Sequence, residues 1–133
     1  MFEVKMRTHW NDADPAGIVY FANHFRFVEQ AEEELFRARG GNRQELLQQH
    51  KVWMPRVEAF SKYVRPIKIG AMIRVRLSTQ PKGLKTIRHE FEILDDVSSE
   101  KLAEGYVTFV CVDADRFKAI PIPDPIRTFI DAK

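Results

Sequence analysis

The chain has 133 residues, 44% of them hydrophobic, which fits one globular domain that buries its own core. Its 21 basic and 19 acidic side chains are interspersed and leave a net charge of +2, so the charge does not point to a nucleic-acid partner. The single cysteine, Cys111, excludes an internal disulfide, and no apolar run is long enough to span a bilayer. We therefore expect one domain, residues 1–133, located in the reducing cytoplasm.

The N-terminal half of the chain predicts a strand, a turn and two helices. Polar and apolar residues alternate over residues 2–7, which indicates a half-buried strand. A turn is expected at residues 14–17, where Asp, Pro and Gly occur together. A long helix should then run from residue 21 or 22 to Arg39, before two glycines. A shorter helix is expected from Asn42, as its N-cap, to His50.

The long helix has an apolar face that covers about half of its circumference, which is wider than a surface helix requires. Glu32 and Arg39 fall inside this face. Two interpretations are open: the two side chains reach a solvated edge or pair with each other, or part of the face lines an interface or a pocket. The apolar members of the face are Phe25, Phe27, Val28, Ala31, Leu35, Phe36 and Ala38.

The C-terminal half changes to an alternating pattern, which predicts antiparallel strands around residues 73–77, 87–93 and 103–111. Turn residues separate these runs at 80–83 and 95–99. The prolines between residues 121 and 125 should end the sheet, and Ile126–Ala132 are expected to add one or two helical turns. One long helix followed by a series of strands is an α+β layout.

The segment Asp12–Asn23 closely resembles the signature of the 4-hydroxybenzoyl-CoA thioesterase family of hotdog proteins, which includes the acyl-CoA thioesterases associated with the Tol-Pal envelope system. Ala71 departs from the pattern, because relatives usually have aspartate there; we interpret that site as structural. Shorter similarities extend the resemblance over nearly the whole chain, at residues 25–31, 66–70, 83–86, 102–105 and 110–113.

The resemblance implies a hotdog fold, in which a curved antiparallel sheet of five or six strands wraps around a long central helix. It implies a homo-oligomer, a dimer joined edge to edge by its sheets or a homotetramer built from two such dimers, with active sites between subunits. The implied substrate is an acyl-CoA and the implied activity is that of a thioester hydrolase. No cofactor is expected, and no metal, since the histidines show no metal-ligand spacing.

Asp14 is the candidate catalytic carboxylate, because the matching aspartate of the family acts as general base or nucleophile. Thiolate is a good leaving group near neutral pH, so one carboxylate is enough for hydrolysis. The alternative is that Asp14 only opens a turn before Pro15. Asp12, two residues away in an extended stretch, should point to the opposite face, and we interpret it as structural.

The developing oxyanion requires donors that are already in place. The backbone N–H of Phe21, at the start of the long helix, matches the donor position of the family. Gly17 fits beside it, since a glycine allows ligand and backbone to approach closely. A plain turn glycine is the equally open alternative.

Three residues of the signature and the helix are candidates for contact with the substrate. Tyr20 lies within the signature itself. His24 occupies a position where many relatives carry tyrosine; it is expected either to contact the acyl group or tune Asp14, or to be a surface or interface histidine. Glu29 matches a position that contacts substrate in some relatives, and a solvated helix glutamate is its alternative.

Lys82, Lys85 and Arg88 cluster at the entrance of a predicted strand and are candidates to hold the phosphates of CoA. A solvated basic turn is the alternative. Other functions also stay open on the same fold: a hydratase or dehydratase acting on an acyl thioester, a thioesterase that acts on acyl carrier protein, or an acyl-CoA-binding scaffold without activity. Cys111, in an apolar run, is interpreted as a core residue.

Overall fold

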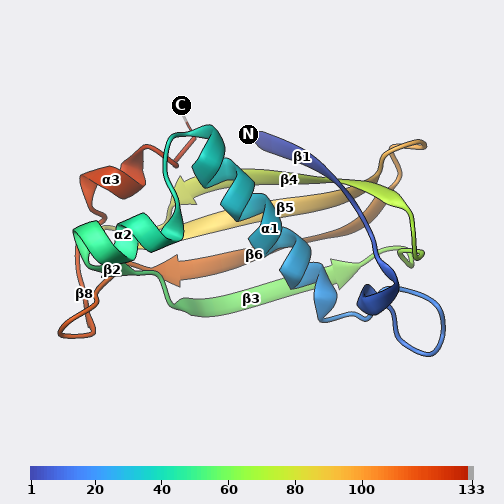
Figure 1. Cartoon of the computed structure of the whole chain (residues 1–133), viewed down its shortest axis with the longest axis horizontal. Coiled ribbons are helices and arrows are strands. Elements are labelled where there is room, and N and C mark those ends of the chain that lie inside the picture. Colours follow the sequence, from blue (N-terminus) through green and yellow to red (C-terminus); the bar gives the residue numbers. More distant parts are fainter. Residues whose placement is uncertain (132–133) are drawn as a thin grey trace.

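A five-stranded antiparallel sheet wraps around one long helix, α1 (Asn23–Ala38), in the computed structural model, which describes residues 1–131 (Figure 1). The strand order across the sheet is β1-β4-β5-β6-β3, so the strand that follows the helix in sequence lies at the edge farthest from β1. This arrangement confirms the predicted α+β class. The strands are β1 (Phe2–Arg7), β3 (Arg56–Tyr63), β4 (Met72–Pro81), β5 (Thr86–Asp95) and β6 (Lys101–Val110).

The core forms where the helix packs against the inner face of the sheet. Every second residue of β4 and β5 points toward α1, because side chains alternate between the two faces of a strand. The helix contributes the matching apolar face, and burying these surfaces is the main favourable term in folding. None of the helices within residues 1–131 is long and apolar enough to cross a membrane. Fully buried members of the core include Phe27, Leu35, Phe36, Ile73, Val75, Leu77, Ile93 and Phe109.

Smaller elements close the two ends of the molecule. A 3-10 turn, η1 (Trp10–Asp12), precedes the long helix, and α2 (Arg43–His50) follows it, with Asn42 as the predicted N-cap accepting the backbone N–H of Glu45 at 2.7 Å. A second, three-stranded sheet has the order β2-β7-β8. Its strands are β2 (Val52–Trp53), β7 (Val112–Asp113) and β8 (Lys118–Ala119).

The C-terminal helix begins earlier in the chain than the sequence predicts, and it is shorter. The structure has one short helix, α3 (Asp124–Arg127), which begins before the predicted Ile126. Proline is tolerated in the first turn of a helix, where its missing N–H would have no partner in any case, so Pro125 belongs to the helix and does not precede it. The end of the predicted segment, Ala132, lies outside the described residues.

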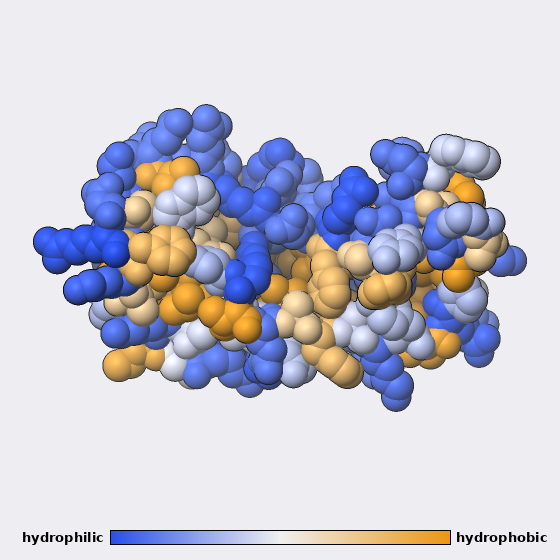
Figure 2. All heavy atoms as spheres, turned by 90° about the horizontal axis from the view of Figure 1, so that it is seen from below, coloured by the Kyte–Doolittle hydropathy of each residue, from blue (hydrophilic) through white to orange (hydrophobic). Residues whose placement is uncertain are grey.

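The edge strand β3 contains a bulge that changes the direction of one side chain. Its register against β6 pairs Arg56 with Phe109 but Glu58 with Thr108, so Val57 is an extra residue in the strand. Arg56 therefore points to the inner face of the sheet, whereas strict alternation would place it outside with Glu58. The molecule seen from the β3 side carries a band of apolar side chains interrupted by charged ones (Figure 2).

Candidate active site

Asp14 lies in the loop between η1 and α1, in a tight turn. Its carbonyl accepts the backbone N–H of Gly17 at 3.0 Å, and its carboxylate Oδ1 accepts the backbone N–H of Ala16 at 2.8 Å. Gly17 has φ of 83°, a backbone conformation that favours glycine. The carboxylate is half-buried, and within residues 1–131 its Oδ2 has no hydrogen-bond partner. Asp14 thus forms the turn with one carboxylate oxygen and keeps the other oxygen available.

Asp12 has a different environment, which agrees with its structural interpretation. Its side chain is buried, and its Oδ2 accepts the backbone N–H of His9 at 2.7 Å, with Arg26 at 3.5 Å from Oδ1. Its carbonyl accepts the backbone N–H of Tyr20 at 2.9 Å and the side-chain amide of Asn23 at 2.8 Å. These bonds tie the two ends of the loop together, so they hold the segment that carries Asp14 against the start of α1.

The start of α1 provides backbone donors without internal partners. The helix begins at Asn23, slightly later than predicted, and its N-cap residue, Ala22, has no side chain that caps the helix. Within the described part of the chain, the backbone N–H groups of Phe21 and Ala22 have no acceptor. The positive end of the helix dipole lies at the same place. The predicted donor, Phe21, is therefore available to a ligand oxygen.

An aromatic cluster surrounds this helix start. The ring centroids of Tyr20 and Phe21 are 4.7 Å apart, and Tyr63 of β3 donates its hydroxyl to the carbonyl of Phe21 at 2.9 Å. Tyr20 and Phe21 are both exposed. Tyr63 was not predicted, because only the fold brings the end of β3 next to the helix start. The cluster offers flat apolar surface directly beside the free N–H groups.

His24 belongs to the buried side of the same cluster, so it is not a surface histidine, and its contact with the acyl group stays a prediction. It is only 3% exposed, its ring packs edge-on against Tyr63 at 4.7 Å, and burial lowers its pKa to about 4. A neutral imidazole is thus expected at neutral pH. The burial of His24 could have been predicted from the sequence, since His24 precedes Phe27 and Val28 by three and four residues and shares their helix face.

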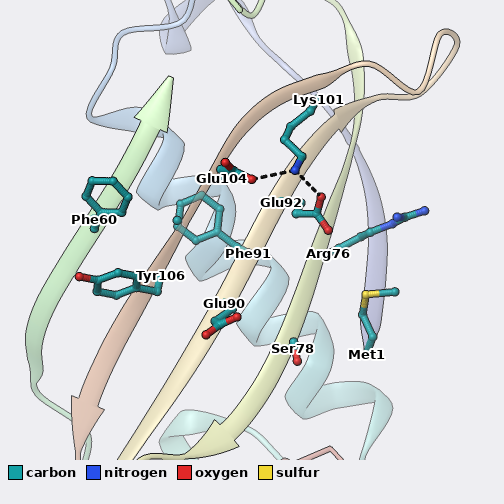
Figure 3. A pocket seen from close by; sticks show the side chains of 11 residues that line it. Met1, Phe60, Arg76, Ser78, Glu90, Phe91, Glu92, Lys101, Glu104 and Tyr106 are labelled. Atoms are coloured by element: carbon teal, nitrogen blue, oxygen red, sulfur yellow. Dashed lines mark hydrogen bonds and ion pairs between the residues drawn. The ribbon is translucent and has the colours of Figure 1, made fainter. Parts of the chain in front are cut away.

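Glu29 is exposed on α1 and lies at the rim of two hollows. One is a cavity of about 160 Å³ between α1 and the strands β3 and β6. The other is a groove of about 630 Å³ beside α2 and β2. A third hollow of about 490 Å³ lies on the outer face of the sheet, where Lys101 bridges Glu92 and Glu104 at 3.2 and 2.7 Å (Figure 3). None of the predicted site residues lines this third hollow, so we treat its charges as surface pairs.

The basic cluster lies at the other end of the sheet. Lys82 and Lys85 are exposed at the turn between β4 and β5. Arg88 binds Thr108 and Glu58, both at 2.9 Å, and lies over the ring of Tyr106. The ten residues of β4, about 30 Å at 3.3 Å per residue, separate this turn from the Asp14 loop. Within one chain, the structure does not bring the basic cluster and Asp14 together.

A buried polar network runs beneath the 160 Å³ cavity. Glu32 is 1% exposed; its Oε2 lies 2.6 Å from Nε2 of His89, and its Oε1 accepts from Arg43 at 2.7 Å and from Arg56 at 2.6 Å. His89 Nδ1 lies 2.8 Å from the hydroxyl of Thr79. Burial alone raises the pKa of Glu32, but the hydrogen bond to His89 and the charges of Arg56, His89 and Arg43 hold that pKa well below its usual range.

This network corrects the expected environment of Glu32. The residue neither reaches a solvated edge nor pairs with Arg39, whose guanidinium binds Asp131 at 3.1 Å. The face of the helix that carries Glu32 does line a cavity, as the second interpretation held. The sequence could not show this, because the partners of Glu32 come from three separate elements, α2, β3 and β5.

Cys111 is fully buried, as expected of a core residue, and burial raises its pKa to about 11.

The comparisons with known proteins agree with this fold. The 1,4-dihydroxy-2-naphthoyl-CoA hydrolase of Thermosynechococcus vestitus is 28% identical over 123 residues, 92% of this chain and 83% of that protein. The acyl-CoA thioester hydrolase YbgC of Escherichia coli is 24% identical over 95% of this chain and 92% of that protein. Both relatives are thioester hydrolases by name, which is the enzyme class predicted for this chain.

Solved structures show the same hotdog architecture. The 1,4-dihydroxy-2-naphthoyl-CoA thioesterase Slr0204 of Synechocystis has a TM-score of 0.91 at 24% identity, over 97% of this chain and 94% of that one. A thioesterase superfamily protein of Jannaschia has a TM-score of 0.86 at 26% identity, over 97% and 90%. Residues 8–130 match the family described as the thioesterase-like superfamily. That match covers nearly the whole chain, so the chain belongs to the thioesterase-like superfamily.

Proposed function

We propose that this protein is an acyl-CoA thioesterase of the 4-hydroxybenzoyl-CoA type, which hydrolyses an aryl- or fatty-acyl-CoA to the free acid and CoA. The observation that carries the proposal is the loop from Asp12 to Asn23. In this loop, one carboxylate oxygen of Asp14 has no hydrogen-bond partner within residues 1–131. The backbone N–H of Phe21, near the end of the loop, has no acceptor within the same residues. A base and an oxyanion donor on one braced loop are the two groups that thioester hydrolysis needs.

In the proposed reaction, Asp14 takes a proton from water as the water oxygen bonds to the thioester carbon. The carbonyl oxygen becomes an oxyanion, which accepts the N–H of Phe21. The carbon–sulfur bond then breaks, the electron pair leaves with sulfur, and the thiolate of CoA takes the proton held by Asp14, which restores the carboxylate. The alternative is direct attack by the carboxylate of Asp14 on the thioester carbon, which expels the thiolate of CoA and gives an anhydride that water then opens.

A hydratase on this fold would need a histidine–carboxylate pair that can accept or donate a proton. The buried pair of Glu32 and His89 does not offer this, because Arg43, Arg56 and His89 occupy both carboxylate oxygens. The second nitrogen of His89 is bound to Thr79. We therefore assign no acid–base role to this network, and we retain acyl carrier protein as an alternative thiol carrier and a binding scaffold as the alternative without catalysis.

We also propose that two chains pair through β3, as a dimer or as a tetramer of two dimers. This strand forms an edge of the sheet and exposes Val57 and Phe60, and the unpaired backbone groups of an edge strand are a ready template for pairing. A two-fold axis would place the Arg56 end of one β3 beside the Tyr63 end of the other. The partner's basic turn, Lys82 to Arg88, would then approach the Asp14 loop from across the interface and hold the phosphates of CoA.

The buried state of the single thiol, Cys111, is compatible with our proposed location in the cytoplasm.

Purified protein is expected to release CoA from at least one aryl- or acyl-CoA ester without added metal. A dye that reacts with free thiols measures the release across a panel of esters. EDTA should have no effect, because residues 1–131 contain no cluster of ligands suited to a metal ion. Tight binding of the esters with no turnover across the whole panel would favour the scaffold instead.

The protein is expected to sediment as a dimer or tetramer at micromolar concentration, and Phe60→Lys should shift it toward monomer. The added charge lies on the edge strand, where pairing would bury it without a partner. Val97→Lys is the matched control, because Val97 is 90% exposed at the turn between β5 and β6 and not on β3. A wild-type monomer that is fully active would refute the proposed assembly.

A further inference from the structure

The cavity between α1 and the edge strand begins where the proposed chemistry takes place. Ala22, the N-cap of α1 and the neighbour of Phe21, lies at one end of it. Its walls are apolar, with Phe25 and Val28 from the helix and Val107 from β6. An acyl group whose carbonyl binds the N–H of Phe21 would therefore extend into this space.

The other end of the cavity is polar. Glu32 lies ten residues beyond Ala22, about 15 Å along the helix axis. Arg56 lines this end too: its Nη2 binds Glu32 at 2.6 Å and its guanidinium lies 4.7 Å from the ring centroid of Phe109. Its Nη1 is buried and, within residues 1–131, has no hydrogen-bond partner. A buried donor of this kind is costly unless something accepts from it.

Arg56 also separates the cavity from the larger groove. Both hollows are lined by Arg56 and Glu29, which therefore form the wall between them. Beyond the wall, the groove is apolar, with Leu47, Trp53 and Met54 along it. The bulge at Val57 is what turns Arg56 into this position.

The size of the cavity limits the acyl group. A cavity of about 150 Å³ holds one benzene ring, and this one measures about 160 Å³. It accommodates a ring or a short chain, while a long chain would need the space behind Arg56.

On the basis of the proposed function, we infer that Arg56 determines specificity: it ends the acyl cavity and donates Nη1 to an oxygen at the far end of an aromatic acyl group. The preferred substrates are then aryl-CoA esters with a hydroxyl or carbonyl oxygen opposite the thioester. Esters of long unbranched acids are disfavoured, because Arg56 blocks their path to the groove.

Binding of two thioether analogues tests the hydrogen bond without any need for turnover. In 4-hydroxyphenacyl-CoA and phenacyl-CoA a methylene separates sulfur from the carbonyl, so neither can be hydrolysed. Calorimetry should show that wild type binds the hydroxylated analogue more tightly, and that Arg56→Met weakens it by about 10- to 100-fold, the range for losing a bond to a charged donor. Phenacyl-CoA should change by less than about 3-fold, since it has no oxygen for Arg56 to bind.

Arg43→Met is the matched control. Arg43 binds the same oxygen of Glu32 at 2.7 Å, but it lines only the groove. It should therefore leave the preference for the hydroxylated analogue unchanged. Equal weakening of both analogues by Arg56→Met, or the same loss of preference in Arg43→Met, would overturn the inference.

The relative rates of hydrolysis of a long-chain and an aromatic ester test whether Arg56 separates the cavity from the groove. Arg56→Ala should raise kcat/KM for dodecanoyl-CoA relative to benzoyl-CoA by about 10-fold or more, because it joins the cavity to the groove. An unchanged ratio would refute the role of Arg56 as a wall. If wild type hydrolyses no ester while the analogues still differ through Arg56, the proposed activity fails and the recognition by Arg56 stands. If wild type hydrolyses esters but the analogues bind alike, only the inference fails.

Discussion

Replacing Asp14 with asparagine is expected to lower kcat by about 10²–10⁴-fold, the range for removing a positioned acid–base group. Asparagine retains the side-chain oxygen that accepts the N–H of Ala16, so the turn should survive the change. What the variant loses is the ability of the second oxygen to take a proton. Steady-state kinetics with the best ester of the panel, together with the affinity for CoA, measure the effect; the affinity should change little.

Asp12→Asn is the control for this variant. Asp12 accepts the N–H of His9 and pairs with Arg26, so the loss of its charge should lower stability more than kcat. Thermal unfolding separates the two effects. If Asp14→Asn retains full activity, Asp14 only forms the turn, and if Asp12→Asn alone abolishes activity, the roles of the two carboxylates are reversed.

A single turnover in ¹⁸O-water distinguishes the two roles open to Asp14. General-base catalysis places solvent oxygen in the acid at the first turnover. Direct attack gives an anhydride, and if water opens it at the aspartyl carbonyl, the first acid formed carries an unlabelled oxygen from Asp14. We expect labelled acid, because the general base needs no strained intermediate.

Glu32→Ala is expected to reduce the free energy of unfolding by about 3–5 kcal/mol, as found when one partner of a buried ion pair is removed. The carboxylate is buried, and its loss would leave Arg43, Arg56 and His89 without their shared acceptor. Urea unfolding at a fixed protein concentration measures the change. The control is Glu34→Ala, whose partner Arg37 lies on the helix surface, and about 1 kcal/mol or less is expected there. Equal effects in both variants would contradict the importance of the network.

The same network predicts a pH dependence of stability. Because the pKa of Glu32 is lower in the folded than in the unfolded protein, its contribution is fully present above the unfolded value of about 4.5. That contribution is lost as the pH falls from there through the folded value. Glu32→Gln should remove this part of the acid dependence.

The fold could be predicted from the sequence because the spacing of apolar residues along a segment shows whether it is a helix or a strand and which of its faces is buried. Alternation in residues 73–77 and 87–93 predicted strands of the sheet, and the apolar arc predicted the helix. The turn that carries Asp14 was accessible for the same reason, since Asp, Pro and Gly set its backbone directly.

The environment of the cavity could not be predicted in this way. Strict alternation places Arg56 on the outer face of β3, and only the register against β6 reveals that Val57 is extra. The burial of Glu32 depends on Arg43 and His89, which are distant in the sequence. The sequence places the basic residues around one turn, but the separation of that turn from Asp14 follows from the length of β4.

The extra residue in β3 affects how substitutions and length changes in this protein and its relatives should be compared. If Val57 were a regular member of the strand and not a bulge, strict alternation would place the aligned arginine on the outer face, opposite the cavity. Deleting Val57 would instead leave Arg56 opposite Phe109, on the inner face. Two homologues can therefore share an arginine at this position and still differ in what it touches. The chemistry at the end of the cavity therefore depends on where β3 accommodates its extra residue as much as on the identity of its residues, and a shift of the bulge along the strand would change which side chain faces the site.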